Sequence, residues 1–263
     1  MIADLSKRLI PDELWEPAAP FLPSFAARPQ GGGTAPCDER AVFTAVVYAL
    51  TSGCAWRHLP TTFGTSPATA HRPFTVWTEA GLRRRLQQAV LDELGARGEV
   101  DWTSAIVDAA SVRAKRGSLT GPNSKLHVLS DAQGIPLAVA VSGANMHDCL
   151  ALKPLIRGIP AVPSRRGPRQ RRPIKLRADK ACFSAEHLAW LRERGLVARN
   201  ARPGIEPGKR LGWHRWNIER SIAWLFGYRR LTVRYERKGS HFLAFLGLAA
   251  ALTCYKKLAK LAT

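Results

Sequence analysis

The chain has 263 residues and a hydrophobic content of 46%, enough for one medium domain and one small domain with a packed core. Its 40 Lys and Arg residues outnumber its 20 Asp and Glu residues, which gives a formal charge of +20. This excess indicates a polyanionic partner and favours nucleic acid over a membrane surface. The longest apolar run, residues 242–254, is shorter than a membrane span of ~20 residues and predicts a buried helix.

The N-terminus carries acidic residues and no apolar signal segment, so we expect a soluble cytoplasmic protein. The five cysteines are odd in number and widely spaced, at positions 37, 54, 149, 182 and 254, without a C-x-x-C pair. This pattern indicates neither a disulfide framework nor a zinc site.

The N-terminal part of the chain is predicted to be helical. Residues 5–25 predict a short helix followed by an irregular proline-rich arm, and residues 28–36 predict a flexible linker. Residues 38–53 begin with an Asp N-cap and end at a Gly, which predicts a helix. A second long helix is predicted over residues 66–95, with a Ser N-cap and Pro at its first position.

Two helices joined by a short connection are typical of a helix-turn-helix DNA reader, here with His71 and Arg72 near the front of the second helix. Any three-helix bundle with a basic surface has the same pattern. Both interpretations stay open at this point.

After Asp101 the hydrophobic period changes to that of an α/β unit. The predicted strands are residues 103–114, 124–131, 135–143, 174–179 and 196–201. The predicted helices are residues 148–158, 185–195 and 213–230. This order is that of a ribonuclease-H-like fold with a mixed five-stranded sheet. We therefore predict a helix-turn-helix-like domain over residues 1–98 and an α/β domain over residues 99–263.

One acidic residue, Glu219, interrupts a helical pattern that is otherwise apolar or basic. At helical spacing it shares a face with Trp216, Ile222 and Phe226, which predicts that the carboxylate is turned toward the core. The simplest partner is Arg215, one turn earlier, in a structural ion pair. The alternative is a metal site completed by carboxylates from strand ends.

Two aspartates supply such carboxylates, because Asp108 ends the first predicted strand and Asp179 ends the fourth. The separations are 179 − 108 = 71 and 219 − 179 = 40 residues. Each Asp alone is most simply a turn or cap residue. Three carboxylates at one point, however, stay ionised only beside cations, and hard divalent ions suit oxygen ligands. Two such ions can activate a water or 3′-hydroxyl for attack on a phosphodiester.

A basic, proline-punctuated loop is predicted over residues 162–173, directly before the strand that ends at Asp179. Its arginines are Arg165, Arg166, Arg169, Arg171 and Arg172. A run of charges is ordinarily a solvated face. Its position in the sequence next to Asp179 favours phosphate contacts that bring DNA to the acids.

Four segments resemble the DDE insertion-sequence transposases of the IS-five family. They are VDAASVRAKRG (107–117), SKLHVLSDAQGIPLAVAVSGANMHD (124–148), LRADKACF (176–183) and HRWNIERSIAWLFGYRRLTVRYERK (214–238). The resemblance extends from residues 9–23 to the C-terminus. Asp108 matches the first acid of the family, Asp179 the second, and Glu219 the third, within an R-x-x-x-E-R motif that starts at Arg215.

The resemblance implies a ribonuclease-H-like catalytic domain in which the three acids hold Mg²⁺ or Mn²⁺, with two ions expected. It implies cleavage at the ends of an insertion sequence and strand transfer into target DNA, by a homodimer assembled on double-stranded DNA. The protein would be associated with the nucleoid. The basic residues of the matching motifs are expected to contact DNA, namely Arg113, Lys115, Lys180, Arg215 and Arg220.

The chain departs from the family pattern in four places. A short Gly- and Lys-containing run after Asn123 is missing, Cys182 replaces a Tyr, and Trp213 replaces a basic residue. Pro73 stands where the family has Arg, and a Pro inside a helix costs roughly 3 kcal/mol or bends it. Changing Pro73 to Arg is therefore expected to restore the helix and tighten recognition of DNA ends.

Two other functions compete with transposition. One is a catalytically weak or inactive DNA-binding protein derived from such a transposase, in which the acids are structural. The other is a nuclease without strand transfer, against which the N-terminal helices argue because they suggest recognition of a site. Dependence on a divalent metal separates transposition from simple binding.

Overall fold

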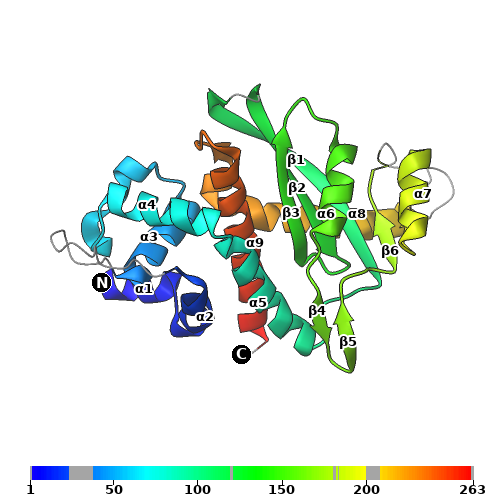
Figure 1. The fold of residues 1–263 in the computed structure, drawn as a ribbon, viewed down its shortest axis with the longest axis horizontal. Helices are drawn as coiled ribbons and strands as arrows, with labels where there is room; N and C mark the ends of the chain where they lie inside the picture. The colour runs from blue at the N-terminus through cyan, green and yellow to red at the C-terminus, as the bar shows by residue number, and fades with distance from the viewer. Residues whose placement is uncertain are drawn as a thin grey trace.

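The computed structural model describes residues 2–23, 38–118, 121–179, 182, 184–199 and 208–261, with residues 2–4, 116–118, 121–122 and 208–215 described by their backbone alone. Helices at the N-terminus lie beside a sheet whose faces and edge are covered by further helices (Figure 1). The predicted linker at residues 28–36 lies outside the described residues. The structure confirms a mixed α/β fold preceded by a helical region.

The helical region contains more breaks than the sequence predicts. Its helices are α1 (Ile2–Leu9), α2 (Asp12–Ala18), α3 (Glu39–Ser52), α4 (Pro67–Glu79) and α5 (Leu82–Ala96). Prediction of one long helix over residues 66–95 was wrong, because Gly81 has a positive φ of 74° that ends α4 and starts α5. The α3 prediction is confirmed, with the Asp38 side chain accepting from the Arg40 N–H and Gly53 at φ 72°.

The main sheet is mixed, as predicted. Its strands are β1 (Ser104–Ser118), β2 (Gly121–Asp131), β3 (Pro136–Gly143), β6 (Lys175–Arg177), β7 (Val197–Arg199) and β8 (Val233–Arg234). The order is β3-β2-β1-β6-β7, and β8 also pairs with β1. The first three strands are antiparallel, whereas β6 and β7 continue the sheet in parallel. The two-residue β8 is a sixth strand that the sequence pattern did not predict.

The basic segment predicted as a loop forms a hairpin of β4 (Val162–Ser164) and β5 (Gly167–Gln170). Ser164 pairs with Gly167, which leaves a two-residue turn. The hairpin packs on α5, where Gly95 permits a close approach, since a Cβ at Gly95 would lie 2.3 Å from a methyl carbon of Val162. Burial of the Val162 side chain against α5 therefore stabilises a packed hairpin where a loop was predicted.

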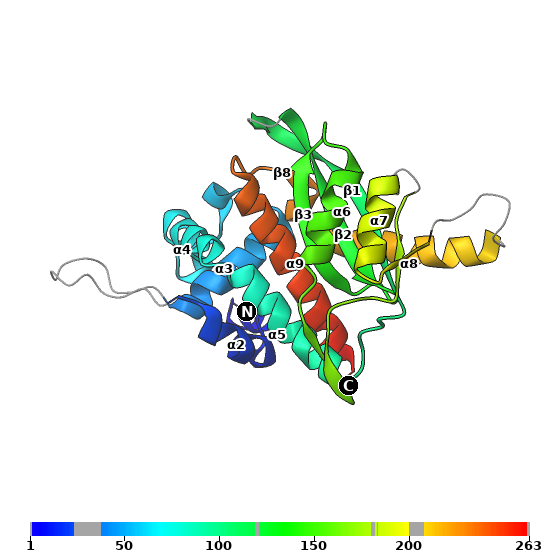
Figure 2. The same cartoon turned by 45° about the vertical axis from the view of Figure 1, so that its right-hand side comes forward.

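Helices cover both faces of the sheet. On one face, α6 (Leu152–Arg157) packs on β2 and β3, and α7 (Ala185–Glu193) lies beside β7. On the other face, α8 (Gly208–Phe226) crosses β1 and β2, as Figures 1 and 2 show from two directions. The helix α9 (Gly239–Lys260) packs against α5 and the edge strand β3, between the sheet and the N-terminal helices.

The 22-residue α9 is the only described helix that is long and apolar enough to cross a membrane, and 61% of its apolar window is buried inside the fold. Its buried residues include 244–254 without interruption, which confirms the predicted buried helix. They join a core cluster that also contains Leu14 and Phe43 from the N-terminal helices and Val128 from the sheet. The predicted domain boundary between residues 98 and 99 stays a prediction, because this cluster has members on both sides.

A buried ion pair ties the helical region to the sheet. Arg230 Nε donates to Glu236 Oε1 at 2.7 Å, and both side chains are 3% exposed. Arg230 also donates to the backbone carbonyl of Cys54, just after α3. Its guanidinium lies 5.1 Å from the ring centroid of Tyr235 and 5.3 Å from that of Phe245. Contacts with a carboxylate, a carbonyl and aromatic rings together compensate the burial of the cation.

We expect Glu236→Ala to lower the free energy of unfolding by about 3–5 kcal/mol, because it leaves the Arg230 guanidinium buried without its carboxylate. Urea denaturation measures this change. Glu93→Ala is the matched control, since Glu93 is 63% exposed and its pair with Arg97 is 4.0 Å long, so its effect should stay within about 0.5 kcal/mol. Equal stability of the two variants would contradict a structural role for the buried pair.

Candidate active site

The register between β1 and β6 relates the positions of the first two acids. Ser104 pairs with Lys175 and Ile106 with Arg177, so the offset is 175 − 104 = 71 and 177 − 106 = 71 residues. Asp108 and Asp179 are separated by the same 71 residues, two positions beyond the last pair, and β6 ends at Arg177. The parallel pairing therefore directs the chain that leads to Asp179 along the edge of β1 on which Asp108 follows.

Asp108 belongs to the face of the sheet that α8 covers. Ile106 and Val112 are buried in one cluster with Ile218 and Leu225 of α8, and Asp108 shares their face through the period of two along a strand. In β6, Leu176 is buried in the cluster on the opposite face, and Asp179 follows after β6 has ended at Arg177. Glu219 comes from α8 itself.

Asp108 does not end its strand, contrary to the prediction, because β1 continues to Ser118. On that edge of β1, however, β6 pairs only as far as Ile106 and β8 pairs only from Arg113. Asp108 lies in the interval between these two partners, with one carboxylate oxygen accepting from the Ala109 N–H at 2.8 Å. The predicted site residue Asp108 thus lies at mid-strand, between the two ranges that pair with this edge of β1.

A turn holds Asp179, because the Cys182 N–H donates to the Asp179 carbonyl at 2.9 Å. The Cys182 side chain is 5% exposed and belongs to the core cluster around Leu191. Burial raises the pKa of the Cys182 thiol, and its hydrogen bond with Cys149 adds to the rise. Cys182, which replaces a Tyr of the family pattern, is therefore a protonated packing group beneath the turn.

The prediction that Glu219 faces the core was wrong, since the residue is exposed. The neighbouring Trp216 is exposed too, at 52%. The buried face of α8 instead contains two polar residues. Asn217 donates to the carbonyl of Ala132 at 2.9 Å, and Ser221 donates to that of Gly134 at 2.7 Å. These bonds to the β2–β3 turn fix the rotation of α8, a preference that hydrophobic spacing does not reveal. The Arg215 side chain lies outside the described residues.

The three acids do not form a closed metal site in the structure. Among residues 2–23, 38–118, 121–179, 182, 184–199 and 208–261, no group of three or more His, Cys, Asp or Glu is close enough to hold a metal ion. Glu219 lies on α8, which crosses the face of the sheet to which Asp108 belongs. The donors are all carboxylates, which suit Mg²⁺ or Mn²⁺.

The arginines of the hairpin are divided between two roles. Arg165 and Arg166 are exposed in its turn. The other three arginines hold the hairpin and the segment after it in place. Arg169 donates to the Asp92 carboxylate at 2.6 Å and to the Ala161 carbonyl. Arg171 donates to the Arg157 carbonyl at 3.2 Å, and Arg172 donates to the Arg194 carbonyl at 3.0 Å.

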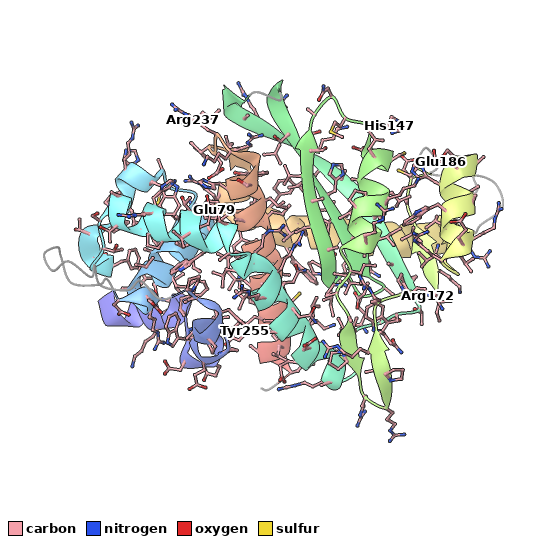
Figure 3. The ribbon with its side chains drawn as sticks, in the orientation of Figure 1. Glu79, His147, Arg172, Glu186, Arg237 and Tyr255 are labelled. Carbon is pink, nitrogen blue, oxygen red and sulfur yellow. The ribbon has the colours of Figure 1, made fainter. Side chains whose placement is uncertain are left out.

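The hairpin is also not beside the acids in space. It precedes β6, and the N–H of Ile174 bonds the carbonyl of Trp102 at 2.9 Å, near the start of β1. Asp179 follows the opposite end of β6. In Figure 3, Arg172 lies low in the view and Glu186, at the start of α7, lies high. The hairpin arginines and Asp179 are close in sequence but lie at opposite ends of β6. The prediction that the arginine run lies beside Asp179 was therefore wrong.

The remaining predicted DNA contacts lie in different surroundings. Arg113 and Lys115 are exposed on β1 beyond Asp108, with the Lys115 ammonium 5.1 Å from the Tyr235 ring. Arg220 lies between two Trp rings of α8. Lys180 lies outside the described residues. Arg220 was predicted from the sequence as a DNA contact, whereas the aromatic row around it was not predicted, although the spacing of four residues is visible in the sequence.

The front of α4 contains one packing residue and one exposed cation. The His71 ring centroid is 5.2 Å from that of Trp56 and 5.6 Å from that of His241. Burial, followed by the charge of Arg230, lowers the pKa of His71, so this imidazole is neutral at pH 7. Arg72 is exposed and available to a phosphate.

Two family models match the chain. Residues 10–87 match a model described as putative transposase of IS4/5 family, and residues 100–254 match a model described as transposase DDE domain. The second match covers more than half of the 263 residues. The chain therefore belongs to the DDE transposase family.

Two curated relatives come from Burkholderia cepacia. The putative transposase for insertion sequence element IS402 is 42% identical over 137 residues, which are 52% of this chain and 65% of the relative. The insertion element IS402 uncharacterized 16.2 kDa protein is 36% identical over 112 residues, 42% of this chain and 76% of that relative. The chain thus spans slightly less than two thirds of the first relative.

A chain in the cryo-EM structure of the simian T-cell lymphotropic virus intasome in complex with PP2A regulatory subunit B56 gamma also aligns. It is 12% identical, with a TM-score of 0.32, over 76% of this chain and 64% of that one. This TM-score is too low to define a shared fold.

The structure reverses the expected effect of Pro73→Arg. Helix α4 continues through Pro73, which is buried, so an Arg there would place a charge in the core. We expect a loss of at least about 3 kcal/mol in the free energy of unfolding, measured by urea denaturation. Arg72→Ala is the adjacent exposed control and should change stability by less than about 0.5 kcal/mol. Wild-type stability of Pro73→Arg would contradict the position of this residue.

Proposed function

We propose that this protein is a DNA transposase that cleaves phosphodiester bonds at the ends of an insertion sequence and joins the freed 3′-hydroxyl to target DNA. The observation that carries the proposal is the parallel pairing of β1 with β6 up to Ile106 and Arg177, which supports a position of Asp108 close to Asp179, on the side of the sheet that α8 covers. Membership of the DDE transposase family supports it. The finer assignment to the IS-five type rests on the motifs around the three acids.

We further propose that the α/β part is ribonuclease-H-like. Three antiparallel strands are followed by two parallel ones in the order β3-β2-β1-β6-β7, with helices on both faces. This topology sets a central strand, β1, which carries Asp108, beside the first parallel strand, β6, which leads to Asp179. The match to the transposase DDE domain over residues 100–254 is consistent with it.

Asp108, Asp179 and Glu219 are proposed to hold two Mg²⁺ or Mn²⁺ ions. When bound, such ions would activate the attacking water or 3′-hydroxyl and stabilise the leaving oxygen. The protein's own contribution is to carry one carboxylate on β1, to bring the second by way of β6 and to bring the third from α8. Arg113 and Lys115, exposed farther along β1, are proposed to bind phosphates of double-stranded DNA at this edge.

The partners are proposed to be the element ends and target DNA, bound by a homodimer that assembles on DNA. A soluble, cytoplasmic, nucleoid-associated protein fits the charge of +20. His71 is removed from the proposed DNA contacts because its ring packs between Trp56 and His241.

A second function, DNA binding without catalysis, is favoured by one observation. Among the described residues, the three acids are not gathered into a metal-binding group. Cleavage and joining of labelled element ends, with Mg²⁺ or with a chelator, distinguish the two functions. Strand transfer also distinguishes a transposase from a nuclease.

We expect Asp108→Asn, Asp179→Asn and Glu219→Gln each to lower the cleavage rate at least about 100-fold, while DNA affinity changes less than about twofold, because only a ligand charge is lost. The rate is measured on labelled element ends with Mg²⁺. Asp12→Asn is the matched control, since Asp12 pairs with Arg40 at 2.6 Å in the helical region. If the amide variants cleave as fast as Asp12→Asn, the three acids are not catalytic.

DNA affinity should fall steeply with salt, and the hairpin turn offers a specific test. If Arg165 and Arg166 each neutralise a phosphate, changing both to Ala should reduce the slope of log affinity against log salt by about 1.8. Fluorescence anisotropy at several salt concentrations measures the slope. Arg169→Ala should instead act mainly on stability, because Arg169 bonds Asp92. An unchanged slope in the double variant would show that the turn does not contact DNA.

A further inference from the structure

A row of alternating rings and charge runs along the outer face of α8. Trp216, Arg220 and Trp224 are four residues apart, so they stack one turn above another. The Arg220 guanidinium lies 4.4 Å from the Trp216 ring centroid and 4.9 Å from that of Trp224. Trp216 is 52% exposed and Trp224 is 40% exposed. Large aromatic residues are more often covered, so two on one helix face need a physical explanation.

The row is held in place from beneath. Arg220 Nη2 donates to the Gln133 carbonyl at 2.6 Å, and Lys257 Nζ donates to the Gln133 Oε1 at 2.5 Å. The bonds from Asn217 and Ser221 to the same β2–β3 turn fix the helix itself. Both Trp rings are therefore presented by a rigid support, which lowers the entropy lost on binding.

A pocket of about 520 Å³ adjoins the row. Trp224 contributes an aromatic wall, Arg220 and Lys257 contribute two cations, Asp101 contributes one carboxylate, and Thr103 and Ser104 contribute hydroxyl groups. An aromatic wall beside two cations matches the chemistry of a nucleotide, because a base stacks on the ring while its phosphate pairs with the cations. Such a polar lining suits an apolar ligand poorly.

The pocket lies on the same face of the sheet as Asp108. Ser104, Ile106 and Asp108 alternate with the buried Ala105 along β1, so their side chains share the α8 face. Ser104 and Asp108 are four residues apart, which corresponds to about 13 Å along a strand. A DNA strand that passes Asp108 can therefore also reach the pocket.

We propose that the Trp216–Arg220–Trp224 row and its adjoining pocket bind an unstacked base of DNA, with the base on an indole ring and the neighbouring phosphate on Arg220 and Lys257. This inference depends on the proposed function in one respect, which is that the ligand is DNA. Extracting one nucleotide from the duplex costs a few kcal/mol, which stacking on an exposed ring offsets. The row would thus select a locally opened DNA end near the acids.

Binding of a fluorescent dT12 oligonucleotide and of a 12-base-pair duplex tests the proposal, in the presence of chelator so that no cleavage occurs. We expect Trp224→Ala to weaken dT12 binding about 5- to 150-fold, the range for losing one base–aromatic stack. Duplex affinity should change less than about twofold. Trp224→Phe keeps a ring and should retain most of the affinity, whereas Trp224→Leu keeps apolar area without a π face and should behave like Ala.

Circular dichroism and urea denaturation establish that each variant is folded, and Trp216→Ala provides a second variant on the same row. Unchanged dT12 affinity in both folded Ala variants overturns the proposal. Equal loss in Trp224→Phe and Trp224→Ala overturns it too. A change of oligomeric state in sedimentation, with dT12 affinity intact, assigns the row to contact between copies of the chain. A variant such as Asp108→Asn can lose cleavage and still bind dT12 with wild-type affinity. That result concerns the proposed active site alone and not the Trp216–Arg220–Trp224 row.

Discussion

The buried pair of Arg230 and Glu236 is the constraint on which the arrangement of the two parts of the chain depends. Arg230 follows α8 directly, and its guanidinium bonds both Glu236 and the carbonyl of Cys54, which follows α3. A buried cation is stable only where its partners are in place, so neither part can shift without exposing a charge to an apolar core. The helical region and the segment that carries Glu219 are therefore joined at one point.

Strand β1 has a comparable role within the sheet. Its 15 residues pair with β2 along one edge and with β6 and then β8 along the other. On the second edge β6 pairs only as far as Ile106 and β8 only from Arg113, and Asp108 lies between these two ranges. Two like charges close together repel, so the site that we propose for Asp108 and Asp179 calls for a cation. The electrostatic arrangement of the proposed site thus follows from strand pairing.

The positive charge of the chain is distributed over surfaces with different surroundings. The exposed turn residues Arg165 and Arg166 lie at the hairpin, remote from the acids, whereas Arg113 and Lys115 continue the strand that carries Asp108. On α8 the cation Arg220 is enclosed by indole rings. Phosphate contacts position a duplex, and aromatic rings accept bases that have left the stack. These surfaces could therefore engage different parts of one DNA substrate.

The sequence by itself determined the class of the fold, and it supplied the three acids that we propose as catalytic. Alternation and turn residues indicate the strands, and the Asp38 cap and Gly53 define α3, because these signals act within a few residues. The rotation of α8 was decided by tertiary structure, since Asn217 and Ser221 bond carbonyls 85 and 87 residues away. The course of β6 likewise separates the basic hairpin from Asp179, although they are close in sequence. Local chemistry specifies elements, whereas the face that an element buries depends on partners that only the folded chain brings near.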